Sequence, residues 1–63
     1  MDNPNDEVVR AVVEGCSLGR SIHEAARNAV RDYPEATIST NAAEEKARVI
    51  IAGNTAYAVL AHN

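Results

Sequence analysis

The stretch SIHEAARNAVRDY, residues 21–33, carries the clearest structural signal in the chain. Ser21 can cap a helix, and Glu24, three residues later, can reach back to complete a capping box. The apolar positions that share one broad helical face are Ile22, Ala25, Ala26, Ala29, Val30 and Tyr33. Pro34 ends the segment, because the residue before a proline avoids helical backbone angles. The stretch therefore predicts an amphipathic helix with one buried face.

Upstream of this stretch, residues 4–14 predict a first helix. Asn3 suits the capping position, and Pro4 suits the first helical position, where a missing N–H costs nothing. The apolar face of this helix consists of Val8, Val9, Val12 and Val13, extended by Cys16. Their spacing favours a helix, because the apolar residues of a half-buried strand alternate with polar ones. Gly15 predicts the end of this helix in a left-handed conformation.

Downstream, a third helix is predicted from residue 42 onward. Three preceding residues suit its cap: Ser39, Thr40 and Asn41. Asn41 with Glu44 would make a second capping box, and Glu44 with Arg48 forms a well-oriented i,i+4 ion pair. Gly53 leaves two interpretations open, since it either divides the last helix in two or weakens one long helix.

The last predicted helix is apolar over nearly its whole circumference. A helix of this kind should be buried on all sides, and two short neighbours cannot surround it. Self-association or a protein partner is therefore expected to cover it. The residues predicted to supply this contact are Val49, Ile50, Tyr57, Val59 and Leu60.

Size and composition set the limits of the fold. The 63 residues are 46% hydrophobic and 24% charged, which predicts one folded domain over residues 1–63. We expect an all-α bundle of three or four helices, completed by self-association, because chains this small need a supplement to their core. Cys16 is the only cysteine, so an internal disulfide cannot supply it. The size and composition argue against a multidomain enzyme and a classical zinc finger.

The cellular location follows from the polar beginning of the sequence. The segment MDNPNDE lacks the basic start and apolar centre of a signal peptide. The longest uncharged run, residues 49–63, is too short to span a bilayer. A lone cysteine fits a reducing compartment. We therefore expect a cytoplasmic protein without a membrane interaction.

Three arginines form a basic stripe on the second predicted helix. Arg20, Arg27 and Arg31 are spaced i, i+7 and i+11, which places them opposite the apolar face. Such an arginine stripe can bind an acidic protein or follow a phosphate backbone. It can also be a solvated surface, because Glu24 and Asp32 lie between and beside the arginines.

Nucleic-acid binding is the weaker interpretation of the arginine stripe. A helix-turn-helix motif needs a turn of three or four residues before its recognition helix, whereas about seven connector residues follow Pro34 here. Glu44 and Glu45 also stand at the start of the next helix, where phosphate contacts would fall. The net charge of −3 is opposite to a basic footprint.

Catalytic, metal and cofactor sites are not indicated. Cys16 and His23 are the only nucleophile and base that lie near each other in the sequence, and a catalytic pair also needs an orienting group and a cleft. A packed thiol fits Cys16 better, because free cysteine is among the most buried residue types. The two histidines and one cysteine lack metal-ligand spacing. We therefore predict a protein that is not an enzyme and holds no cofactor.

These features together predict a small protein-binding module. We expect a homodimer or other homo-oligomer that acts as an accessory regulator or inhibitor by docking on an acidic or apolar protein. Two alternatives remain open at this point. One is a transcriptional regulator that binds nucleic acid through the arginine stripe, and the other is an oligomer that binds a small anionic ligand.

Overall fold

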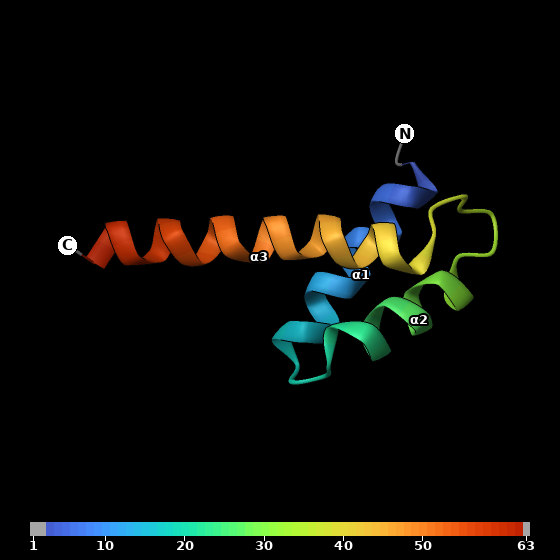
Figure 1. Ribbon diagram of the computed structural model, residues 1–63, viewed down its shortest axis with the longest axis horizontal. Coiled ribbons are helices and arrows are strands. Elements are labelled where there is room, and N and C mark those ends of the chain that lie inside the picture. The colour runs from blue at the N-terminus through green and yellow to red at the C-terminus, as the bar shows by residue number, and fades with distance from the viewer. Residues whose placement is uncertain (1–2, 63) are drawn as a thin grey trace.

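Three helices in mutual contact make up the fold of the described residues. The computed structural model describes the backbone of residues 3–62 and the side chains of residues 3–54. The helices are α1 (Pro4–Ser17), α2 (Ile22–Asp32) and α3 (Thr40–His62), and each contacts the other two. Figure 1 shows α1 and α2 gathered at the N-terminal half of α3, while its other half extends beyond them. The predicted all-α class is confirmed, and α3 runs through Gly53 without a break.

Side-chain caps begin each helix. The Asn5 backbone N–H donates to Asn3 Oδ1 over 2.9 Å, and the Glu24 N–H donates to Ser21 Oγ over 3.2 Å, as the sequence predicted. At α3 the Ala42 N–H donates to Ser39 Oγ over 3.1 Å. The predicted cap at Asn41 is wrong, because the helix begins earlier and Asn41 lies within its first turn.

The end predicted for the first helix at Gly15 is also wrong. Helix α1 continues to Ser17, and the left-handed residue is Gly19, with φ of 93°. Gly15 is buried where α1 approaches α2, and a Cβ atom placed on it would lie 2.8 Å from the Ala25 Cβ. Its missing side chain therefore lets two helices come close together, a tertiary requirement that resembles a helix stop in the sequence.

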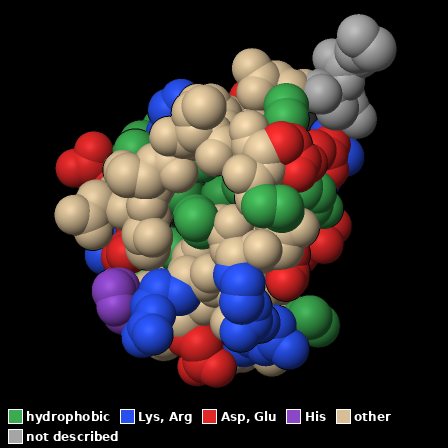
Figure 2. Space-filling model, turned by 90° about the vertical axis from the view of Figure 1, so that its right-hand side faces the viewer, with side chains coloured by type: hydrophobic (Ala, Val, Ile, Leu, Met, Phe, Trp, Pro, Cys, Tyr) green, Lys and Arg blue, Asp and Glu red, His purple; other side chains and the backbone are tan. Residues whose placement is uncertain are grey.

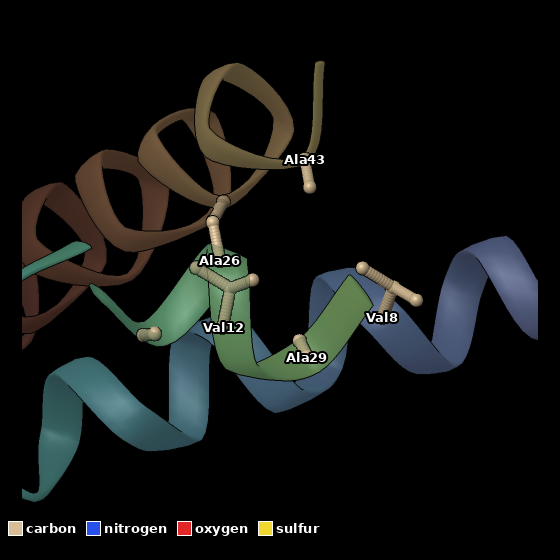
Figure 3. Close-up of a cluster of buried hydrophobic side chains, with 7 residues drawn as sticks. Val8, Val12, Ala26, Ala29 and Ala43 are labelled. Carbon is tan, nitrogen blue, oxygen red and sulfur yellow. The ribbon is translucent and has the colours of Figure 1, made fainter. Parts of the chain in front are cut away.

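The core consists of small apolar side chains from all three helices. Figure 3 shows this cluster, in which Val8 and Val12 of α1 lie with alanines of α2 and α3. The buried set is Val8, Val12, Ala25, Ala26, Ala29, Ala43 and Ala47. Val8 and Val12 are the largest side chains that are fully buried among the described residues. The predicted apolar faces are thus confirmed, but they bury little area per residue.

Asn5 connects the start of α1 to the segment between α2 and α3. Its Oδ1 accepts the backbone N–H groups of Thr37 over 2.8 Å and Ile38 over 3.1 Å. Its Nδ2 donates to Thr37 Oγ1 over 3.1 Å. A single amide side chain therefore holds the connector in place. It accepts hydrogen bonds from two backbone N–H groups that lie outside the helices and have no acceptor within them.

We expect Asn5→Ala to lower the free energy of unfolding by about 1–3 kcal/mol, because two backbone donors lose their acceptor. Urea denaturation followed by circular dichroism measures this loss. Asn41→Ala is the matched control, and it should leave stability within about 0.5 kcal/mol, as for an exposed residue without special contacts. Equal losses for the two substitutions would contradict the role assigned to Asn5.

Candidate functional site

An apolar groove lies between α1 and the middle of α3. Its volume is about 730 Å³, and α1 contributes Asp6, Val9, Arg10 and Val13 to its lining, while α3 contributes Lys46, Val49 and Ile50. The four aliphatic side chains form an apolar floor. The three charged side chains come from both helices and carry both signs. We call this surface the α1–α3 groove.

Two of the groove residues are large apolar side chains exposed to solvent. Val49 is 73% exposed and Ile50 is 42% exposed, whereas Ala43 and Ala47 on the same helix are fully buried. Helix α3 therefore uses its small side chains against α1 and α2 and leaves β-branched side chains uncovered. Burial of such side chains stabilises an assembly by about 1.5–3 kcal/mol each when it is complete.

Helix α3 reaches well beyond the part of the molecule that packs against it. At a rise of about 1.5 Å per residue its 23 residues span about 34 Å, and the molecule measures 42 Å along its longest axis. The end of the packed region is visible in Figure 1, where only α3 continues toward the C-terminus. Among the predicted contact residues, Tyr57, Val59 and Leu60 have side chains outside the described residues.

The arginine stripe is exposed, and α2 carries most of it. Arg20, Arg27 and Arg31 are all exposed, and Arg20 lies in the turn before α2. A polar hollow of about 630 Å³ on α2 includes Arg27 and Arg31 among its lining residues, together with Ser21, His23, Glu24 and Asn28. The structure thus joins two of the three predicted arginines in one hollow.

Acidic side chains interrupt this basic surface. Figure 2 faces the end of the molecule where α2 meets the connector, and it shows basic side chains toward its lower edge with acidic ones between them. Arg31 Nε lies 3.8 Å from Asp32 Oδ1, and both side chains are largely exposed. The surface around the arginine stripe therefore carries charges of both signs.

Glu44 joins α2 to α3 beside the polar hollow. The residue is only 8% exposed, its Oε2 lies 3.0 Å from His23 Nδ1, and its Oε1 lies 3.6 Å from Arg48 Nη2. The predicted pair of Glu44 and Arg48 is confirmed. The link to His23 crosses between helices, so the sequence pattern of either helix alone could not indicate it.

The structure pairs His23 with Glu44, and Cys16 packs half-buried against the core. Within the described residues, no group of three or more histidine, cysteine or acidic side chains is arranged to hold a metal ion. The same part of the chain contains no helix with the length and hydropathy needed to cross a membrane.

Sequence reasoning missed most of the groove lining. It named Val49 and Ile50, but it missed Asp6, Arg10 and Lys46, and it assigned Val9 and Val13 to the core alone. Val9 and Val13 lie one helical turn apart at the edge of the α1 apolar face, which is the one signal that could have indicated a second surface. The charged residues became visible only when α1 and α3 were placed side by side.

Comparison with known protein families, curated proteins and solved structures found no match to this chain.

We expect Glu44→Ala to lower the free energy of unfolding by about 1–2 kcal/mol, because a carboxylate that bridges two helices is lost. Glu45→Ala is the matched control, since Glu45 is the exposed neighbour on the same helix. Thermal unfolding monitored by circular dichroism compares the two variants. A Glu44→Ala variant as stable as Glu45→Ala would show that the link between α2 and α3 is dispensable.

Proposed function

We propose that this chain is a small non-enzymatic protein-binding module, an oligomeric accessory regulator or inhibitor that acts by docking on another protein. The observation that carries the proposal is the α1–α3 groove with its exposed Val49 and Ile50. An apolar floor with a charged rim is the general composition of a protein interface. The cytoplasm is the location that we propose for it.

The total surface of the molecule supports this proposal. The chain exposes 4568 Å², whereas a compact monomer of 6.7 kDa exposes about 3,900 Å². Its radius of gyration is 12.2 Å, and a compact chain of this length has about 10.6 Å. Both quantities indicate surface beyond that of a self-contained domain. Figure 1 shows the extended shape that goes with these values, because the C-terminal half of α3 continues beyond α1 and α2.

The arginine stripe supplies the second part of the proposal, which is selection of an acidic partner. Arg27 and Arg31 lie in the polar hollow and Arg20 lies before it, away from the α1–α3 groove. One surface can therefore serve self-association while the other contacts a different protein. Charged residues at such a surface raise the association rate and the specificity more than the affinity.

Substitution of Leu60 tests the self-association. We expect Leu60→Asp to shift the chain toward the monomer, because a charge would be buried in an apolar contact. Analytical ultracentrifugation over a range of concentrations measures the shift, and circular dichroism checks that the helices persist. Leu60→Met is the matched control and should sediment like the unsubstituted chain. An unchanged sedimentation coefficient and melting curve for Leu60→Asp would count against an interface at this position.

Charge reversal tests the role of the arginine stripe. Arg27→Glu combined with Arg31→Glu should leave the fold intact, since both side chains are exposed, and should abolish binding to a partner captured with the unsubstituted chain. The doubly substituted Arg27→Lys, Arg31→Lys variant keeps the charge and should retain most of the binding. Survival of partner binding after the double reversal would show that the stripe is only a solvated surface.

A further inference from the structure

We propose that the α1–α3 groove is filled by α3 of a second copy of this chain. In this arrangement the two α3 helices run antiparallel about a two-fold axis between residues 51 and 52. Each projecting half then lies along the groove of the other copy. The inference rests on the self-association proposed above. It adds which segment fills the groove, the relative direction of the two α3 helices and the residues that lie opposite one another.

The chemistry of the groove defines what can fill it. Its floor is formed by Val9, Val13, Val49 and Ile50, and its charged residues are Asp6, Arg10 and Lys46. A charged occupant on this floor would lose its hydration without a buried partner, which is costly. The chain itself supplies an uncharged occupant, because residues 49–63 contain no Asp, Glu, Lys or Arg.

The geometry of α3 brings that occupant to the right place. Residues 43 and 47 are buried against α1 and α2, residues 52–54 are exposed, and the helix is continuous to His62. The two halves of α3 are therefore of similar length, one packed and one projecting. A single continuous helix cannot fold back into its own groove, but a two-fold axis at its middle places each projecting half against the other groove.

The exposed area matches what this dimer requires. The surface in excess of a compact monomer is about 650 Å² for each chain. A standard protein interface buries about 800 Å² on each partner. The excess surface of each chain is therefore close to the area that one interface would bury. A two-fold dimer buries the same surface on both copies.

The sequence spacing along α3 supplies the register. Ile50, Gly53, Tyr57 and Leu60 follow one another at intervals of three, four and three residues, which is the spacing of a helix-pairing seam. An axis between residues 51 and 52 sets Ile50 opposite Gly53 and Lys46 opposite Tyr57. Apart from its chain neighbours and the nearby backbone of its own helix, no described residue has an atom within 4 Å of a Cβ atom placed on Gly53, so among the described residues this position is open to a side chain from a second copy.

Paramagnetic relaxation between two copies tests this arrangement directly. A nitroxide group is attached to the cysteine of a Lys46→Cys, Cys16→Ala variant. This nitroxide-bearing chain is mixed with the unsubstituted chain, which alone carries the isotopes that nuclear magnetic resonance detects. Lys46 is exposed at the rim of the groove, so the labelled chain should keep its fold. Only effects between copies are then observed. We expect the strongest broadening at amides around residue 57 of the second copy. A label at Arg27→Cys on α2 is the matched control and should broaden these amides far less.

Other outcomes would overturn the arrangement. Broadening centred on residue 46 would indicate parallel helices, because antiparallel pairing separates the two Lys46 positions by about 16 Å along the axis. Broadening centred elsewhere, in a chain that sediments as an oligomer, would refute this register but leave the proposed function in place. An unsubstituted chain that sediments as a monomer at all concentrations, together with no broadening, would refute the dimer, while the arginine reversal would still test docking on another protein.

Discussion

The close packing of small side chains between the helices determines how the three helices are arranged. Gly15 and Ala25 meet where α1 approaches α2, and Ala43 and Ala47 bring α3 against both. Alanine permits short distances between helices, but it removes little apolar surface from water. A core of this composition gives a defined arrangement with a small driving force, so stability must draw on other contacts.

Two polar side chains supply such contacts between the elements of the fold. The Asn5 side chain holds the connector, and Glu44 joins α2 to α3 through His23. Neither adds apolar burial, and the large apolar side chains at Val49 and Ile50 remain exposed. One face of helix α3 completes the core, and its C-terminal half together with the α1–α3 groove forms the interface that we propose.

Local sequence signals predicted those features that depend on neighbours within one helical turn. The caps at Asn3 and Ser21, the apolar face of α2 and its end before Pro34 are all of this kind. Gly15 was misassigned, because a glycine required by the close approach of another helix looks the same in sequence as one that ends a helix. The Asn5 contacts join residues 32 and 33 positions apart, and no periodic pattern encodes them. Only Val49 and Ile50 of the groove lining were predicted, since the exposed apolar side of α3 follows from its composition but the contribution of α1 does not.

We propose that folding of this chain is coupled to its association. The melting temperature as a function of protein concentration tests it most directly, because a partner that binds only the folded state makes that temperature depend on concentration. We expect the melting temperature to rise by about 10 °C over a hundredfold increase in concentration, given the unfolding entropy of two chains of this length. A melting temperature that stays constant over the same range would contradict it.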